Sequence, residues 1–393
     1  MEGYLTLIKI KLPTQGLFQN EEHTYEGVQG VFCHISWELQ NQKPILVPMF
    51  KDLQEKSPLC QATQITMDFH DVADKARAFD RNGHNFTTTQ KSRYHQVVQP
   101  KAVIFHETRC GSTLVSNLLT TSLPEQTKTY SEAQPPLMAL MACDILSNQG
   151  KYCDQESQVA LIRDVFYMMG RMTRPKKPQH LFFKMQSMGS RYIDIFSEAM
   201  PSTQWAFIFR DSVEILMSHL SYLVKGDSAV ENDPTPVCLR DYRKANQHSS
   251  LREVVAEAGR NVTSLTKEEY CAAHVASLAQ SAIQEYNRLH PAGLKKGNYN
   301  RKQWFLNYEG LPHVLWEEWM PYLHMGYMEK EMKERMQQMA NLYSKNRGQD
   351  VAQPWHEDST MKQSRAPESV KRAVELFLDP VYSAMNEIQA SQT

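Results

Sequence analysis

From about residue 100 onward, short apolar runs alternate with amphipathic stretches along the chain. Residues 102–105 (Ala-Val-Ile-Phe) and 205–209 (Trp-Ala-Phe-Ile-Phe) lack the polar alternation of half-exposed strands. Such runs are typical of strands buried on both faces of a parallel sheet. Apolar residues at helical spacing follow each run. The pattern predicts strands at 102–105, 180–184, 205–209 and from Trp304, and helices at 155–170, 268–289, from about Ser212 and from about Pro367.

This alternation predicts an α/β fold with a parallel sheet flanked by helices over residues 99–393. Residues 225–270 are polar and contain several prolines, so we expect an insertion or lid there. Residues 1–98 give weaker signals: strand-like alternation at 4–10 and 30–37, and a short helix at 71–79. They are interpreted as an N-terminal accessory segment of mixed structure that covers or shapes the substrate cleft.

The net charge and the hydropathy of the chain argue against a nucleic-acid-binding protein and a membrane protein. The chain has 43 Lys and Arg against 44 Asp and Glu, a formal net charge of −1, so no nucleic-acid partner is expected. No apolar run approaches the roughly 20 residues that span a bilayer, and no basic segment followed by an apolar one begins the chain. We therefore expect no membrane partner and no leader peptide.

The cysteines and histidines show no ligand spacing. The seven cysteines are odd in number, scattered and without a C-x2-C pair, which predicts reduced, mostly buried thiols in a cytoplasmic protein. The histidines of the first 95 residues have irregular separations, so no metal site is predicted.

The turn after the first predicted strand carries the strongest candidate chemistry. Gly111 lets the backbone approach a ligand, and Ser112 and Thr113 begin a helix whose N–H groups are unpaired. With Arg109 these groups form an anion site; an ordinary helix cap is the equally weighted alternative. The Gly-x4-Gly-Lys-Ser/Thr spacing of nucleotide triphosphatases is absent, so a phosphate held without metal is expected.

Three further polar residues follow predicted strands. Glu132 lies where ligands gather at the carboxyl edge of an open sheet, although a carboxylate complementing a helix N-terminus is the alternative. Lys184 ends a buried strand, which is costly unless it faces an anion. Arg210 ends another, and Ser218 lies eight residues later on the predicted helix.

The strand-Arg-x-Gly-Ser-Thr-helix pattern resembles the 5'-phosphosulfate loop of sulfotransferases that use 3'-phosphoadenosine 5'-phosphosulfate (PAPS). The resemblance covers roughly residues 100–385 and implies a fold related to the P-loop nucleotide triphosphatases. It assigns the donor's 5' end to five consecutive residues, Arg109, Cys110, Gly111, Ser112 and Thr113.

The same resemblance implies the catalytic roles. Glu132 matches the general base of the Golgi tyrosyl and heparan type, and Lys184 and Arg109 match the catalytic cations. The cytosolic type has a histidine base two residues after the lysine. Gln186 stands there in this chain and cannot take a proton near neutrality, which favours the glutamate-base type.

Three other segments match more weakly or with departures. Arg210 and Ser218 are similar to the 3'-phosphate site, with Ser212 in place of the usual proline. Tyr308, in Tyr-Glu-Gly-Leu, is similar to the tyrosine that lies against adenine, with a core tyrosine as the equal alternative. The C-terminal loop adds three candidate phosphate contacts for which a solvated basic loop is at least as good an interpretation: Ser344, Arg347 and Lys362.

The implied reaction is in-line transfer of a sulfuryl group from PAPS to a hydroxyl or amine of a small-molecule acceptor (EC 2.8.2), without metal, releasing 3'-phosphoadenosine 5'-phosphate (PAP). One alternative is a catalytically inactive regulatory protein that binds PAP or PAPS. Another is a metal-dependent, kinase-like enzyme with a degenerate loop. A homodimer is left open, and the sequence does not identify the acceptor.

Overall fold

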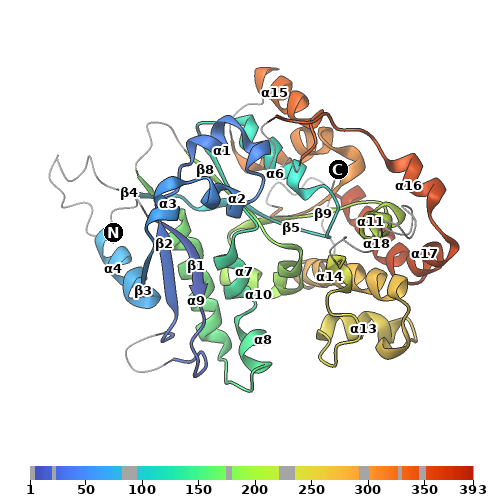
Figure 1. Cartoon of the computed structure of the whole chain (residues 1–393), viewed down its shortest axis with the longest axis horizontal. Coiled ribbons are helices and arrows are strands. Elements are labelled where there is room, and N and C mark those ends of the chain that lie inside the picture. Colours follow the sequence, from blue (N-terminus) through green and yellow to red (C-terminus); the bar gives the residue numbers. More distant parts are fainter. Residues whose placement is uncertain are drawn as a thin grey trace. The chain divides into compact units, whose positions relative to one another are not determined.

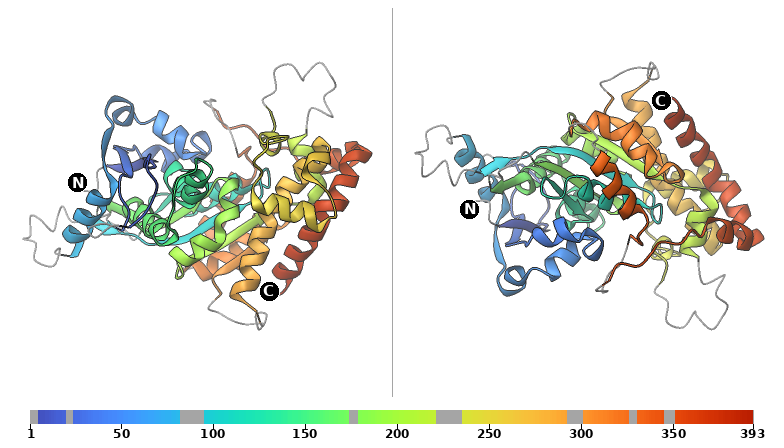
Figure 2. Two further views of the ribbon diagram at one scale, coloured as in Figure 1. Left: turned by 90° about the horizontal axis from the view of Figure 1, so that it is seen from below. Right: turned by 90° about the horizontal axis from the view of Figure 1, so that it is seen from above.

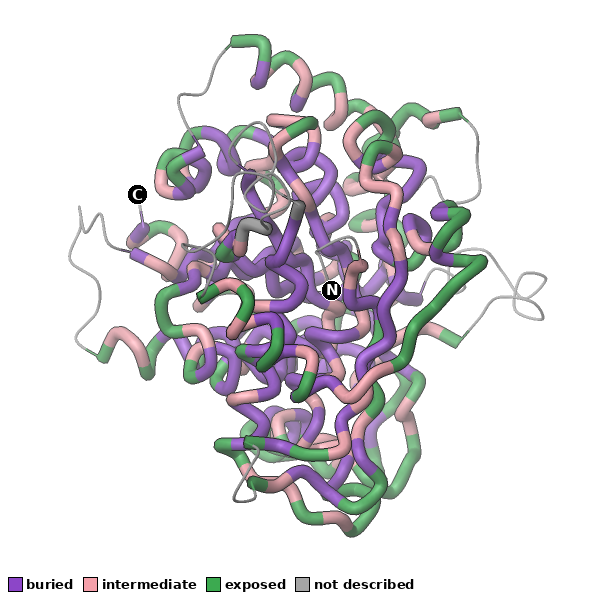
Figure 3. The backbone as a smooth tube through the Cα atoms, turned by 90° about the vertical axis from the view of Figure 1, so that its left-hand side faces the viewer, coloured by how far each residue is buried: buried purple, intermediate pink, exposed green. Residues whose placement is uncertain are grey.

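Strand β5 (Pro100–His106) contains the apolar run predicted as a strand at 102–105, and all four side chains of that run are fully buried. Its neighbours have the same character. The computed structural model describes residues 5–19, 24–81, 95–173, 179–220, 235–291, 301–325, 330–344 and 351–392. Buried segments alternate with exposed turns along this chain (Figure 3).

The central sheet has five parallel strands in the order β10-β9-β5-β8-β6; β5, β8 and β9 are labelled in Figure 1. Its order places β5, the strand before the candidate loop, in the middle. The predicted α/β fold with helices flanking a parallel sheet is confirmed. The other four strands are β6 (Thr127–Ser131), β8 (His180–Lys184), β9 (Gln204–Phe209) and β10 (Gln303–Asn307).

The chain divides into two compact units, and β5 contributes residues to both. Unit 1 consists of residues 1–103, 113–204 and 325–354. Besides β6 and β8 it contains α1 (Glu38–Gln42), α2 (Phe50–Glu55), α3 (Pro58–Ala62), α4 (Phe69–Arg81), α6 (Ser112–Ser122, from its second residue), α7 (Gln134–Leu140), α8 (Ala142–Ser147), α9 (Gln155–Gly170), α10 (Ile193–Ala199) and α15 (Lys330–Ala340).

Unit 1 also carries smaller sheets. The N-terminal residues form a three-stranded antiparallel sheet of β1 (Thr6–Lys11), β2 (Gln29–Cys33) and β3 (Ile65–Asp68), and α9 packs against β1 (Figure 1). Strands β4 (His95–Val97) and β7 (Arg171–Thr173) pair with each other. The mixed structure expected of the N-terminal segment is therefore present. The sequence predicts a domain boundary between residues 98 and 99. The two compact units are not domains in that sense and do not test this boundary, which stays a prediction.

Unit 2 consists of residues 104–112, 205–324 and 355–393. Its long helix α14 (Lys267–Leu289) packs against the C-terminal helices (Figure 2). Residues 225–234 of the predicted lid lie outside the described residues, and the lid remains a prediction. The other helices of unit 2 are α11 (Ser212–His219), α13 (Ser249–Glu257), α16 (Ser359–Arg365), α17 (Glu368–Ala373) and α18 (Asp379–Ala390).

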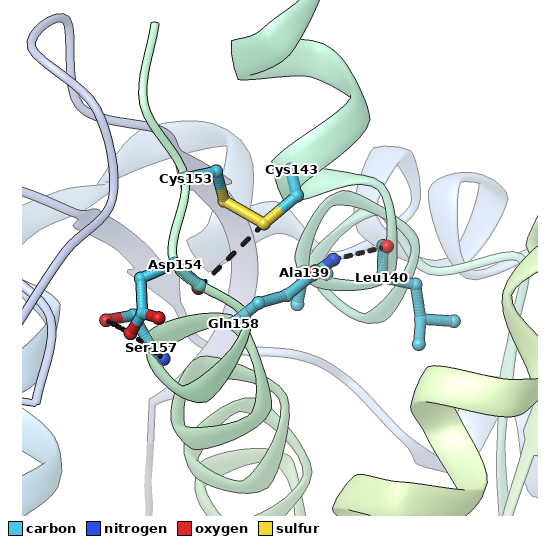
Figure 4. The surroundings of a disulfide bond; sticks show 7 residues. All are labelled: Ala139, Leu140, Cys143, Cys153, Asp154, Ser157 and Gln158. Carbon is cyan, nitrogen blue, oxygen red and sulfur yellow. Dashed lines mark hydrogen bonds between the residues drawn. A yellow bond between two sulfur atoms is a disulfide. The ribbon is translucent and has the colours of Figure 1, made fainter.

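Six of the seven cysteines are paired, so the prediction of reduced thiols is wrong. The disulfides are Cys33–Cys60, Cys143–Cys153 and Cys238–Cys271, and the buried thiol of Cys110 takes part in none of them. Figure 4 shows the second pair, where the Cys143 sulfur also lies 3.9 Å from the carbonyl oxygen of Asp154. Irregular spacing misled the sequence interpretation because the fold, not proximity along the chain, brings each pair together.

Within the described part of the chain, no helix combines the length and the apolar character needed to cross a membrane.

Candidate functional site

The loop between β5 and α6 holds two residues in the left-handed region of backbone conformation. Arg109 has φ of 67° and Gly111 has φ of 87°. A side-chain-bearing residue in this region costs about 1–3 kcal/mol, and such strain gathers at functional sites. Arg109 is exposed at the tip of the loop, and the buried Cys110 thiol donates to the carbonyl of Glu107 at 2.9 Å. The loop therefore exposes the Arg109 side chain, while the hydrogen bond of the buried Cys110 holds the loop backbone in place.

Gly111 cannot be replaced by a larger residue without a collision. A Cβ atom at this position would lie 2.2 Å from Cδ2 of Tyr308. Next to it, the hydroxyl of Ser112 is buried and has no hydrogen-bond partner within the residues that the structure describes. Thr113 is buried in the first turn of α6. An outward arginine, a glycine without room for a side chain and an unpartnered buried hydroxyl fit an anion such as phosphate.

Arg210 is the centre of a second group of polar residues, all in unit 2. Its guanidinium lies over the ring of Tyr308, with Cζ 4.3 Å from the ring centroid, and pairs with the carboxylate of Glu214. Asp358 lies 3.5 Å from Arg210 and also pairs with Lys362 at 2.7 Å. We call Arg210, Glu214, Tyr308, Asp358 and Lys362 the arginine cluster.

The arginine cluster connects several of the predicted site residues. The ring of Tyr308 lies next to both Arg210 and Gly111, so the loop and the end of β9 lie close together. Tyr308 is half-buried rather than a fully buried core residue. Ser218 is half-buried on α11, four residues beyond Glu214 and thus one turn along the same helix face.

Glu107 was not singled out by the sequence, yet it joins the loop to Arg210. Its carboxyl oxygen accepts the backbone N–H of Arg210 at 3.3 Å, and its own N–H donates to the carbonyl of Ile208 at 3.2 Å. Complete burial raises the pKa of Glu107 to about 8, with a small opposing effect of the Arg210 hydrogen bond. At neutral pH this carboxyl group is therefore mostly neutral.

In unit 1, the structure brings Glu132 and Lys184 together. The fully buried Lys184 amino group forms an ion pair with the Glu132 carboxylate, which is partly exposed. Glu132 has φ of 55°, a second strained residue among the candidates, and its N–H donates to the Lys184 carbonyl at 2.7 Å. Gln186 donates from Nε2 to the Glu132 carbonyl at 3.3 Å. The residue in the place of the histidine base thus helps to hold Glu132.

Of the remaining predicted residues, Ser344 and Arg347 lie outside these groups, and Lys362 belongs to the arginine cluster. The carbonyl of Ser344, in unit 1, accepts a hydrogen bond from Asn117 at 3.1 Å. Arg347 lies outside the described residues. Burial lowers the pKa of Lys362, and the hydrogen bond to Asp358 partly opposes that shift.

One group of potential metal ligands occurs within the described part of the chain. It consists of His219, Cys238 and Cys271, whose ligand atoms lie within 4.8 Å of one another. Because the two cysteines form a disulfide, their sulfur atoms are not thiolate ligands. This group therefore offers a metal only one strong ligand.

Neither a protein-family model nor a curated protein matches the sequence. Among solved structures, the chain is similar to a sulfotransferase from Alicyclobacillus acidocaldarius, at 12% identity, over 76% of this chain and 98% of that one, with a TM-score of 0.35. It is also similar to the sulfotransferase domain from the curacin biosynthetic pathway, at 13% identity, over 75% and 98%, with a TM-score of 0.33. At this level of similarity the function has to be argued from the chain's own residues.

Proposed function

We propose that the protein is a PAPS-dependent sulfotransferase that acts on a hydroxyl or amine of a small-molecule acceptor. The observation that carries the proposal is the contact series from Gly111 through Tyr308 to Arg210 in unit 2. It joins a phosphate-type loop, an aromatic ring and a buried cation at the ends of adjacent strands. A nucleotide with phosphates at two separate positions requires such an arrangement of groups.

Each group has a role toward the donor. The 5'-phosphosulfate binds Arg109 and the loop from Cys110 to Thr113, where the Ser112 hydroxyl has no other described partner. Tyr308 lies against the adenine. In this proposal the 3'-phosphate binds Arg210 and Ser218, and three further residues are phosphate contacts: Ser344, Arg347 and Lys362. No metal takes part.

The transfer is an in-line displacement at sulfur. The acceptor oxygen or nitrogen forms a bond to sulfur while the bond from sulfur to the bridging phosphate oxygen breaks, and PAP leaves. Glu132 takes the acceptor's proton, and Arg109, Lys184 and the loop N–H groups stabilise the charge that develops on the bridging oxygen. The ion pair with Lys184 supports this assignment because it places the proposed base and the second proposed cation next to each other.

The three disulfides bear on where the protein works. Disulfides form and persist in oxidising compartments and are rare in the cytosol. We therefore propose an oxidising compartment in place of the predicted cytoplasm. A small-molecule acceptor remains the proposed partner, without nucleic acid or membrane, and a homodimer stays open.

Two measurements test the proposal. Titration calorimetry should show that PAP binds much more tightly than ATP. Labelled PAPS should then transfer sulfate to at least one member of a panel of alcohols, phenols, amines and saccharides. We expect Glu132→Gln to lower kcat by about 10²–10⁴-fold, and Arg109→Ala and Lys184→Ala to lower it by orders of magnitude too. Arg210→Ala should mainly weaken donor binding, and the exposed Glu257→Gln serves as the control.

The outcomes separate the alternatives. Equal binding of PAP and ATP contradicts the proposal. Selective PAP binding without transfer to any acceptor in the panel favours the inactive regulatory protein, and a requirement for magnesium favours the kinase-like enzyme. Full activity of Glu132→Gln would show that the base is a different group.

A further inference from the structure

The arginine cluster is already balanced in charge. Arg210 and Lys362 contribute two positive charges, and Glu214 and Asp358 contribute two negative ones, all joined by ion pairs. A phosphate monoester brings about 1.5–2 further negative charges at neutral pH. Placed beside both carboxylates, it would meet like charge that offsets its attraction to the two cations. One carboxylate therefore has to leave before a phosphate binds well.

Of the two carboxylates, Asp358 is the one more easily displaced. The Glu214 side chain is 7% exposed. Glu214 lies in the first turn of α11, four residues after Arg210, and its carboxylate is in close contact with the Arg210 guanidinium. The Asp358 side chain is 40% exposed and lies 3.5 Å from the same group. Moving Asp358 into water costs little because much of its carboxylate is hydrated already.

The helix that follows Asp358 is also weakly anchored. None of the residues of α16 is buried. Its described contacts with the body of unit 2 include polar ones at hydrogen-bond distance: Ser359 to Arg210 at 3.4 Å and Gln363 to Asp211 at 2.7 Å. Few buried contacts mean a low free energy of local opening. A ligand on Arg210 can thus move this segment without disrupting the core.

We propose that the Asp358 carboxylate occupies the place of the donor's 3'-phosphate on Arg210, and that the donor binds by displacing it. Lys362 then exchanges its partner, from Asp358 to the phosphate, and α16 shifts with it. Asp358 in this way sets the affinity for 3'-phosphorylated nucleotides. The inference rests on the proposed function, since it takes Arg210 as the 3'-phosphate ligand.

The test compares two single-charge variants of the full chain by titration calorimetry. Asp358→Asn keeps the size of the side chain and removes its charge, and Glu357→Gln makes the same charge change at the exposed neighbouring residue. The ligands are PAP and adenosine 5'-monophosphate, which differ in the 3'-phosphate. We expect Asp358→Asn to bind PAP about two- to fivefold more tightly than the wild type, the scale of one partly exposed ion pair.

Adenosine 5'-monophosphate should bind the wild type and both variants equally, and Glu357→Gln should leave PAP binding unchanged. If PAP binds the wild type and Asp358→Asn with the same affinity, the displacement is refuted while the proposed function stands. A gain of the same size in Glu357→Gln would also refute it, since a general charge effect would then explain the result. If no form of the protein prefers PAP to the monophosphate, both proposals fail together.

Discussion

At the scale of single residues, Gly111 offers the clearest test of the loop. Alanine at Gly111 must adopt φ of 87° and place a methyl group against the Tyr308 ring. Gly259 also has positive φ, 67°, but a Cβ there meets nothing within 4 Å. We expect Gly259→Ala to lower the free energy of unfolding by about 1 kcal/mol and Gly111→Ala by a further 1–3 kcal/mol or so from the collision. Urea unfolding measures both.

The same pair of variants separates stability from ligand binding. Gly111→Ala should also weaken PAP binding, because the loop backbone moves, whereas Gly259→Ala should leave it unchanged. Equal losses of stability in the two variants would mean that the Tyr308 ring yields without cost and does not constrain the loop.

Glu107 predicts a dependence of stability on pH. Burial raises its pKa in the folded protein to about 8, compared with about 4.3 in an unfolded chain. The folded state therefore binds more protons between these values, and the stability from this group is complete below about pH 4 and is lost as the pH rises through 8. Glu107→Gln, which stays neutral, should remove a slope of up to about 1.4 kcal/mol per pH unit in that window. Urea unfolding from pH 5 to 9 measures the slope, and equal slopes would show that Glu107 is ionised in the folded protein.

The sequence indicated the cations of the site and Glu132, but not the acids that accompany Arg210. Arg109 and Arg210 were recognisable because each follows a buried run and precedes a helix. Glu214 had a signal that could have been used, its position four residues after Arg210 on a helix. Asp358 had none, since it lies 148 residues from Arg210 along the chain. The role of Glu107 depends on complete burial, which a local pattern cannot show.

At the scale of elements, the long helix α14 depends on its first turn. Thr266 accepts the N–H of Glu269 at 3.2 Å, and the Glu269 carboxylate accepts the N–H of Thr266 at 2.9 Å. Thr266→Ala should lower the free energy of unfolding by about 1 kcal/mol. Thr266→Ser restores the hydroxyl and should recover most of the loss in the same urea experiment. If serine is no better than alanine, the methyl group of Thr266 matters and the hydrogen bond does not.

The elements that could be predicted are those with a long or wholly apolar pattern. Strands at 102–105 and 205–209, and helices at 155–170 and 268–289, appear as β5, β9, α9 and α14 with small changes of boundary. The first 98 residues contain short helices of five or six residues and the half-exposed strand β3. Such short segments present too few turns or alternations for periodicity to distinguish them from loops.

At the scale of the whole molecule, the three disulfides predict how stability responds to reduction. The pairs are 27, 10 and 33 residues apart, so closing them restricts the unfolded chain to different extents. Replacing both cysteines of a pair by alanine should cost about 2–4 kcal/mol. Loop length alone makes the loss about 1 kcal/mol larger for Cys238–Cys271 than for Cys143–Cys153. Urea unfolding of the paired variants measures this difference.

Thiol counting and the site of production test the same disulfides directly. Denatured protein made in a secretory host should expose a single reactive thiol, Cys110, and its thermal midpoint should fall when reductant is added. Protein made in a reducing cytosol should unfold at that lower thermal midpoint. The midpoint should rise after oxidation, because the fold already places each pair of sulfur atoms at bonding distance. Seven reactive thiols in the secreted protein, together with a thermal unfolding midpoint that reductant does not change, would contradict the disulfides and favour the cytoplasm. The proposed PAP site does not depend on this result, because its residues form none of the disulfides.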